Sequence, residues 1–306
     1  MRIATLTLNP CIDKAYYCED IEINRLNRAV KTTVSVGSKG INVSRVLKLF
    51  GVDAPAYCFL GGAAGKLAAE LMNVSCVPVF TQAETRMNIK LIDTKNDTFT
   101  EINENGGPIE PSELSEMLER LDAISEPDIL SLGGSIPAGV TKTVYADIIR
   151  LMKGKNIRCT LDCDGEALKY GIEQRPYLIK PNRYELETFT GLRYTSLKDT
   201  GAACMGIYEK YGCIVLNTLG ADGAIIACPD GLFHVSAPKV TAIGFAGAGD
   251  TFLAAFLHNS LNGGGVKESM ALAASAAAAK VTVEGTEMPP PERLAEYAEQ
   301  VAVSKM

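Results

Sequence analysis

Short apolar runs recur along almost the whole chain and alternate with stretches of helical periodicity. Most of these runs are continuous and do not alternate with polar residues, which is typical of parallel strands covered on both faces. We therefore expect strands at residues 3–8, 56–60, 129–132, 157–161, 177–179, 214–217 and 224–227.

The intervals between these runs carry helix signals. Apolar residues at three- and four-residue steps, followed by a glycine stop signal, occur at Val43, Val46, Leu47, Phe50 and Gly51. Prolines at helix-start positions predict further helices from Pro111 and Pro291, and residues 266–281 form an alanine-rich helix suited to close packing on a sheet. The alternation predicts an α/β fold, a three-layer αβα sandwich with a mainly parallel central sheet.

Two stretches break this pattern because they are richer in β-branched and polar residues. They predict strands outside the main sheet, at about 12–36 and 86–104, which would form a small β-sheet lid. Asn96-Asp97 is a hairpin turn signal between two of them. Without a low-complexity linker or an internal repeat, residues 1–306 are expected to form a single domain with this lid.

Composition and charge narrow the function classes. The net charge of −6 argues against nucleic acid as a partner, and an anionic substrate would need a local cluster of cations or a helix N-terminus. No apolar run approaches the ~18 residues of a membrane span. The chain begins directly with a strand-like run, and its nine cysteines show no paired framework, so we expect a cytoplasmic protein with reduced thiols.

The strongest local signal is a small-residue loop at 244–251 that opens a helix and contains Gly247, Ala248, Gly249 and Asp250. Such a loop presents unpaired backbone N–H groups beside the positive end of the helix dipole, where they stabilise a transferring phosphoryl group. Asp250 could accept the proton of a substrate hydroxyl. The same motif also fits a helix cap with a glycine turn, and the motif alone does not separate the two.

Other polar segments are weak individually. Gly37 to Asn42 is a second glycine-rich loop at a helix start, and it includes Lys39 and Gly40. Arg86, Asn88 and Lys90 share one face of a strand by alternation, as an ordinary solvated face would. Asp13 follows the first strand, and residues 217–223 follow a later one, at the sheet edge where α/β folds bind ligands.

Two familiar nucleotide signatures are excluded. The segment 61–67 imitates a P-loop but is one residue short between its glycines and lacks the Ser or Thr after its lysine. No G-x-G-x-x-G motif follows the first strand, so a dinucleotide site has no support.

Taken together and in this order, the segments resemble the ribokinase/PfkB carbohydrate kinase family over essentially the whole chain. The resemblance implies that Asp250 is the catalytic base and that Gly247, Ala248 and Gly249 form an anion hole. Asn182 to Glu185, after Lys180-Pro181, matches the N-x-x-E motif, whose glutamate helps to place Mg²⁺ through water. It also implies ATP-phosphate contacts at Lys180, Asn182, Thr218, Gly220 and Gly223, with adenine near Ala276 and Lys280.

Within that family the chain is similar to the 1-phosphofructokinase and tagatose-6-phosphate kinase branch. The segments that carry this similarity are Leu8 to Lys14, Ser38 to Val43, Glu84 to Lys90, Thr100 to Asn103, Gly134 to Gly139 and Asp162 to Leu168. It implies that cations contact the phosphate already present on the sugar, a role for Lys39, Arg86, Lys90 and Arg28. Asp13 and Asn42 would hold sugar hydroxyls, with Gly37, Gly40 and Asn88 beside them.

The resemblance implies ATP-dependent phosphorylation of a primary hydroxyl of a ketohexose phosphate, with fructose 1-phosphate as the leading substrate. Tagatose 6-phosphate and fructose 6-phosphate remain alternatives, and a noncatalytic sugar-phosphate sensor is the alternative of another class. A homodimer through the lid strands is expected. The chain departs from the family pattern at Ser38, at Phe245-Ala246 and in a shortened 65–81 stretch, which bears on substrate fit.

Overall fold

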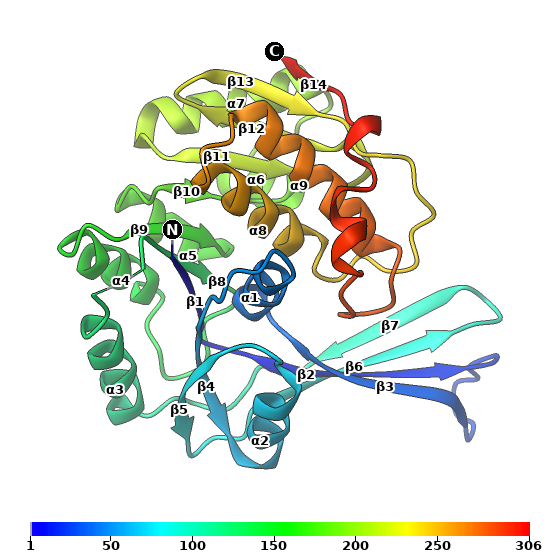
Figure 1. Ribbon diagram of the computed structural model, residues 1–306. Coiled ribbons are helices and arrows are strands. Elements are labelled where there is room, and N and C mark those ends of the chain that lie inside the picture. Colours follow the sequence, from blue (N-terminus) through cyan, green and yellow to red (C-terminus); the bar gives the residue numbers. More distant parts are fainter. Residues whose placement is uncertain (1, 126) are drawn as a thin grey trace.

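The computed structural model describes residues 2–125 and 127–306 and shows two β-sheets (Figure 1). The larger sheet has ten strands in the order β14-β13-β12-β11-β10-β9-β8-β1-β4-β5. In chain order these are β1 (Ile3–Thr7), β4 (Ala56–Gly61), β5 (Cys76–Thr81), β8 (Ile129–Gly133), β9 (Arg158–Asp162), β10 (Leu178–Ile179), β11 (Ile214–Thr218), β12 (Ala224–Cys228), β13 (Gly231–Val235) and β14 (Val303–Lys305). The seven strands that are neighbours in the order β11-β10-β9-β8-β1-β4-β5 are parallel, and β12, β13 and β14 add antiparallel pairs at one edge.

Helices cover both faces of this sheet. One face carries α1 (Lys39–Leu49), α2 (Gly62–Leu71), α8 (Ala248–Leu261) and α9 (Val266–Val281). The other carries α3 (Pro111–Asp122), α4 (Val144–Lys153), α5 (Gly165–Glu173), α6 (Arg183–Thr190) and α7 (Leu197–Tyr211). Successive β1 residues enter different cores, Ile3 on the α8–α9 side and Ala4 on the α4 side, because strand side chains alternate between faces. The three-layer αβα prediction is confirmed.

The smaller sheet projects from one end of the larger one (Figure 1). Its four strands follow the order β3-β2-β6-β7, with β2 (Cys11–Cys18), β3 (Ala29–Gly37), β6 (Arg86–Asp93) and β7 (Thr98–Asn103). The β2–β6 pair is parallel and the other two pairs are antiparallel. Asn96-Asp97 lies in the turn between β6 and β7, as the sequence predicts. These strands lie in the ranges expected for a lid, and residues 19–28 connect β2 to β3.

The expected α-helix from Pro291 is wrong. Pro291–Ala295 is a short 3-10 helix. Pro290 and Pro291 stand at its N-cap and first position, where proline is tolerated, so the start signal was correct and only the helix type was not. Strands β5, β13 and β14 were not anticipated, because they lie at or next to an edge of the sheet, are only partly buried and lack a long apolar run.

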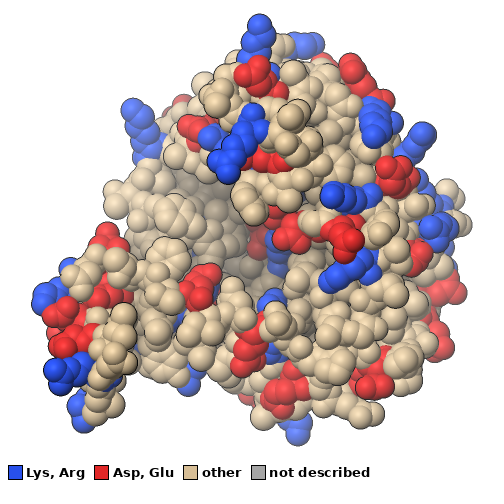
Figure 2. Space-filling view, turned by 180° about the vertical axis from the view of Figure 1, so that it is seen from behind, with Lys and Arg blue, Asp and Glu red and all other residues tan. Residues whose placement is uncertain are grey.

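The parallel arrangement places the site. The carboxyl ends of parallel strands open at one edge of a sheet, so the segments after β1, β9 and β11 meet there. The first turns of α1 and α8 lie at the same edge, since Asn42 and Asp250 are in hydrogen-bond contact. Viewed from behind, the surface is hollowed between the projecting small sheet and the body, and acidic and basic side chains are interspersed on that face (Figure 2).

Candidate active site

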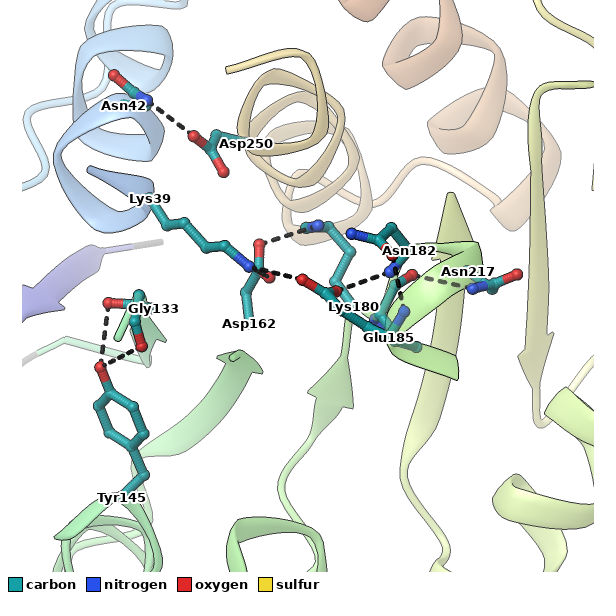
Figure 3. Close-up of polar contacts among 12 residues, drawn as sticks. Lys39, Asn42, Gly133, Tyr145, Asp162, Lys180, Asn182, Glu185, Asn217 and Asp250 are labelled. Carbon is teal, nitrogen blue, oxygen red and sulfur yellow. Dashed lines mark hydrogen bonds and ion pairs between the residues drawn. The ribbon is translucent and has the colours of Figure 1, made fainter. Parts of the chain in front are cut away.

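The start of α8 combines free backbone donors with a buried carboxylate. Gly247 precedes the helix with a positive φ of 77°, which a glycine adopts without strain. The amides of Gly249 and Asp250 donate to no carbonyl among the described residues, as expected in a first helical turn. Asp250 is buried, and its Oδ2 accepts a 2.8 Å hydrogen bond from Asn42 Nδ2 of α1 (Figure 3).

The surroundings of Asp250 make its carboxylate more basic. Burial is the main cause, and the negative charge of Asp162 adds to it, so the pKa of Asp250 is raised to about 6. The ammonium groups of Lys180 and Lys39 and the hydrogen bond from Asn42 oppose the shift without cancelling it. A carboxylate with a pKa just below neutrality is charged at pH 7 and basic enough to accept a proton.

Two lysines and two carboxylates form a partly buried ion-pair group beside Asp250. Lys39 Nζ lies 2.6 Å from Asp162 Oδ1 and 3.3 Å from Glu185 Oε1, and Lys180 Nζ lies 2.9 Å from Asp162 Oδ2 (Figure 3). Burial alone would raise the pKa of Asp162, but the two ammonium groups outweigh it and hold the pKa below its ordinary value. Burial likewise disfavours the Lys39 ammonium, but Asp162 and Glu185 raise its pKa.

Glu185 also fixes the start of α6. Asn182 caps the helix by accepting a hydrogen bond from the Glu185 amide, while Glu185 Oε2 accepts one from the Asn182 amide, both at 2.8 Å. The backbone of Asn182 forms an isolated parallel β-bridge with Thr218 at the end of β11. The N-x-x-E segment is therefore held against the loop that contains Gly220 and Gly223.

A cavity of about 730 Å³ opens beside the start of α8. Its lining includes Ala248, Gly249, Asn182 and Thr218. The remaining lining side chains are mostly small and apolar: Leu219, Gly220, Ala221, Gly223, Ala237, Pro238, Val240, Ala242, Phe245, Phe252, Ala274, Ala277, Ala278 and Val281, together with Arg183 and Tyr184. Its volume suits a nucleotide-sized ligand.

The position expected for adenine, near Ala276 to Lys280, stays a prediction. On α9 the cavity is lined by Ala274, Ala277, Ala278 and Val281, whereas Ala276 and Lys280 themselves do not border it. Residues 276 and 280 lie on another face of the same helix: Ala276 packs in the core, and Lys280 is directed toward Gly247. Lys180 also lies outside the cavity lining, in the ion pair with Asp162.

Polar side chains gather on the small sheet where β2 and β6 pair. Asn88 Nδ2 donates to Asp13 Oδ1 at 3.1 Å, and Lys90 Nζ lies 3.7 Å from Asp13 Oδ2. Gly37 closes this group from β3, because a Cβ there would lie 2.4 Å from Asp13 Oδ2. Asn88 Oδ1 is buried without a hydrogen-bond donor among the described residues, which leaves it able to accept one from a ligand hydroxyl.

The cations expected on the sugar phosphate are not all together. Arg86 begins β6 and binds the carbonyl oxygens of Asn9 and Glu104 at 3.0–3.2 Å. Arg28 is exposed in the connection between β2 and β3. Lys39 makes its ion pairs with Asp162 and Glu185, not on the small sheet with Arg86 and Lys90. Gly40, in the first turn of α1, packs against β1, where a Cβ would approach Thr7 Oγ1 to 2.6 Å.

Sequence reasoning assigned no role to Asp162, although the residue was noted within the family resemblance. A signal was available, since Asp162 ends an apolar strand at the ligand-binding edge of the sheet. Ser38, noted as a departure from glycine, has a φ of 147°, a backbone conformation that favours glycine. The rejected P-loop imitation begins α2, where the Ala64 amide donates to Glu84 at 2.7 Å, so this helix start is already occupied by a carboxylate.

Comparison with known proteins agrees with this geometry. The sequence model of the pfkB family of carbohydrate kinases matches residues 6–293. The 1-phosphofructokinase of Bacillus subtilis is 34% identical over 83% of this chain and 84% of its own, and a tagatose-6-phosphate kinase of Staphylococcus epidermidis is 33% identical over 82% and 83%. The structure of Escherichia coli phosphofructokinase-2 in complex with substrates and products superposes with a TM-score of 0.93, at 26% identity over 98% and 99%.

The fold and the site thus define an ATP-dependent sugar kinase. The chain belongs to the pfkB family of carbohydrate kinases. Sugar kinases of this family use ATP and a divalent metal ion. No helix in the described part of the chain is long and apolar enough to cross a membrane.

Proposed function

We propose that the protein transfers the γ-phosphoryl group of Mg-ATP to a primary hydroxyl of a ketohexose phosphate, converting fructose 1-phosphate to fructose 1,6-bisphosphate. The observation that carries this proposal is the buried Asp250 at the start of α8, between residues that line a nucleotide-sized cavity and the Asn42 contact on α1. The names of the relatives at 34% and 30% identity support the choice of substrate. A coupled assay of ADP release with a panel of ketohexose phosphates tests it.

In the proposed mechanism Asp250 accepts the proton of the substrate hydroxyl as that oxygen bonds to the γ-phosphorus. The bond from phosphorus to the β–γ bridging oxygen breaks, and ADP leaves with the electron pair. The amides of Gly249 and Asp250 would donate to the transferring group, and Gly247 and Ala248 shape the turn that exposes them. The small sheet would act as a lid that excludes water, the competing acceptor.

Lys39 and Lys180 would serve the nucleotide end of this reaction. Lys39 and Lys180 converge on Asp162 next to Asp250, so their ammonium groups are placed for the phosphates at the junction of the two substrates. Asp162 holds both of them in position. We therefore assign Lys39 to the transferring phosphoryl group. Arg86 and Lys90 are retained as contacts of the phosphate on the sugar, and Asp13 and Asn88 as contacts of the sugar hydroxyls.

Mg²⁺ would be the divalent ion. The described residues contain no cluster of three or more His, Cys, Asp or Glu side chains that could hold a metal alone. That fits an ion bound mainly through nucleotide phosphates and water, since Mg²⁺ retains several waters and needs only one or two carboxylates. Glu185 and Asp162, both beside Lys39, are the carboxylates that would hold its waters. The ion would neutralise phosphate charge.

Tagatose-6-phosphate or fructose-6-phosphate kinase activity is the alternative within the class, favoured by the 33% identity to a tagatose-6-phosphate kinase. Each of these substrates has a phosphate at one end and a primary hydroxyl at the other, so the charges of the site do not distinguish them. Their rates of ADP release in the substrate panel do. Tight binding of a sugar phosphate without ADP release would instead indicate a noncatalytic sensor.

Arg86→Ala should raise KM for the phosphosugar about ten- to a hundredfold and leave kcat within about threefold. A charge-assisted hydrogen bond contributes about 1.5–3 kcal/mol, and each 1.4 kcal/mol is a factor of ten. Steady-state kinetics with both substrates varied measure this, with exposed Arg193→Ala as the matched control. An unchanged KM, or an unphosphorylated sugar as the best substrate, would contradict the assignment.

The cavity lining predicts weak discrimination between nucleotide bases. The polar side chains lie near α6 and β11, whereas the walls formed by α9 and by residues 237–242 are alanine, proline and valine among the described lining residues. Apolar walls offer no side-chain donor or acceptor to distinguish adenine from guanine. We expect kcat/KM for GTP within about 100-fold of that for ATP, whereas a hydrogen-bonding pocket discriminates by about 10⁴ or more. A preference of that larger size would refute this view of the cavity.

The expected homodimer remains a proposal. Large apolar side chains are exposed on the small sheet and its connection: Ile23, Leu26, Val30, Val34, Phe99 and Ile102. A second copy would bury such a surface. One structure of Escherichia coli phosphofructokinase-2 is described as a tetrameric inhibited form. We also propose a cytoplasmic location, since the nine free thiols suit a reducing compartment.

A further inference from the structure

Lys280 is a buried lysine that forms no ion pair with a carboxylate among the described residues. Two lysines are buried among the described residues, and Lys180 pairs with Asp162 at 2.9 Å. Lys280 is 0% exposed, and its one hydrogen bond in the described structure runs from Nζ to the carbonyl oxygen of Gly285 at 2.8 Å. Burial of a charge without an ion-pair partner lowers the stability of a fold. A buried lysine in this position therefore indicates a role other than stability.

The Lys280 side chain lies directly behind the proposed anion hole. A Cβ at Gly247 would be 3.4 Å from Lys280 Cε and 3.5 Å from Asn42 Nδ2. Lys280 and Asn42 therefore meet at the residue from which α8 begins. Asn42 in turn donates a hydrogen bond to Asp250. The aliphatic part of the Lys280 side chain therefore lies against Gly247 and Asn42, the residues that position the amides of the first turn of α8 and the carboxylate of Asp250.

The Gly285 carbonyl belongs to a segment that shapes the same loop. The amides of Ile243 and Gly244 donate to Val281 O at 2.7 and 3.2 Å, which ties the approach to α8 to the end of α9. A Cβ at Gly244 would lie 3.5 Å from both Val283 O and Gly285 N. By binding Gly285, Lys280 links the segment after α9 to the loop before α8.

The charges around Lys280 come from four elements. Asp250 of α8 and Glu287 after α9 favour its ammonium form, while Arg45 of α1 and Lys90 of β6 disfavour it. Burial is the largest influence, followed by Arg45, and together they lower the pKa of Lys280 to about 8. The group therefore carries its charge at pH 7 and loses it as the pH rises through about 8.

We propose that Lys280 is a positioning residue for phosphoryl transfer, a fixed cation that holds the start of α8 in shape and places positive charge behind its amides. It touches neither substrate and acts through Gly247, Asn42 and Gly285. The proposal rests on the proposed function of the α8 start as the anion hole. A charge fixed in a buried site stabilises negative charge that develops in the transition state without reorganisation during the reaction.

Lys280→Met tests this directly, because methionine fills most of the space without a charge. We expect kcat to fall about ten- to a hundredfold, less than the ~10²–10³ for loss of a direct oxyanion donor, with KM for ATP and for the phosphosugar changed less than about threefold. The melting temperature should stay the same or rise, since replacing buried charge with apolar volume is often neutral or stabilising. A purely structural lysine would instead change stability together with activity. Exposed Lys267→Met on the same helix is the matched control and should change neither.

Two further measurements isolate the charge. Propylammonium ions added to Lys280→Ala should restore part of the lost kcat, and the neutral alcohol propanol should not. Wild-type kcat should fall as the pH rises through about 8, and this fall should be absent in Lys280→Met, because no ammonium group remains to be deprotonated.

A folded Lys280→Met with normal kcat overturns the proposal, as does rescue by propanol equal to that by propylammonium. If neither variant folds, a wild-type kcat that stays flat to pH 9 overturns it, whereas a fall near pH 8 supports it. These failures would leave the proposed kinase function intact if the wild-type protein releases ADP with a ketohexose phosphate. Absence of ADP release by the wild-type protein with every ketohexose phosphate of the panel would remove the proposed function itself.

Discussion

Asp250→Asn should reduce kcat about 10²- to 10⁴-fold while KM for both substrates changes little, because a positioned general base contributes a factor of that size. Asparagine cannot accept the hydroxyl proton, but its side-chain oxygen can still accept the 2.8 Å hydrogen bond from Asn42. Binding and folding should therefore persist. Coupled ADP-release kinetics, together with a melting curve, measure both parts of this result.

The pH dependence gives an independent measure of the same group. Burial raises the pKa of Asp250 to about 6, and the base works only when deprotonated, so wild-type activity should fall as the pH drops below about 6. Asp97→Asn is the matched control: this residue lies in the exposed β6–β7 turn with a φ of 50°, which asparagine tolerates. Turnover near the wild-type rate in Asp250→Asn would remove Asp250 from the base role and leave the helix cap as its function.

Lys39→Met should lower kcat about 10²- to 10³-fold, as expected for loss of a group that stabilises transition-state charge. Lys39 is in ion pairs with Asp162 and Glu185 beside Asp250, so its removal should affect the transferring group and the nucleotide. KM for the phosphosugar should change less than about threefold. Asp162 keeps its 2.9 Å partner Lys180, so the variant should remain folded.

The outcome decides between two positions for this lysine. If Lys39 bound the phosphate of the sugar, as expected from the family resemblance, KM for the phosphosugar would rise and kcat would be nearly preserved, which is the pattern expected for Arg86→Ala. The same substitution at Lys66, an exposed residue of α2, controls for the loss of a surface charge. A kinetic pattern identical to that of Arg86→Ala would refute the assignment to the nucleotide end.

Local patterns identified most elements of the larger sheet and several of the helices. Continuous apolar runs marked seven of its strands, and the alanine-rich segment 266–281 coincides with α9. These features are visible because periodicity and turn chemistry are properties of neighbouring residues. Strands β5, β13 and β14, at or next to the edges of the sheet, were missed because partial burial leaves a weak pattern.

By itself the sequence determined the fold class, the family and the two glycine-rich helix starts that contain Asn42 and Asp250. Only the tertiary structure decided which partner each charged side chain meets, as in the convergence of Lys39 and Lys180 on Asp162. It also decided which face of α9 lines the cavity. The run of four alanines at residues 276–279 places the same small side chain on every side of α9, so periodicity cannot separate Ala277 at the cavity from Ala276 in the core. Ion pairs between distant strand ends depend on how the layers pack, and no local pattern records that.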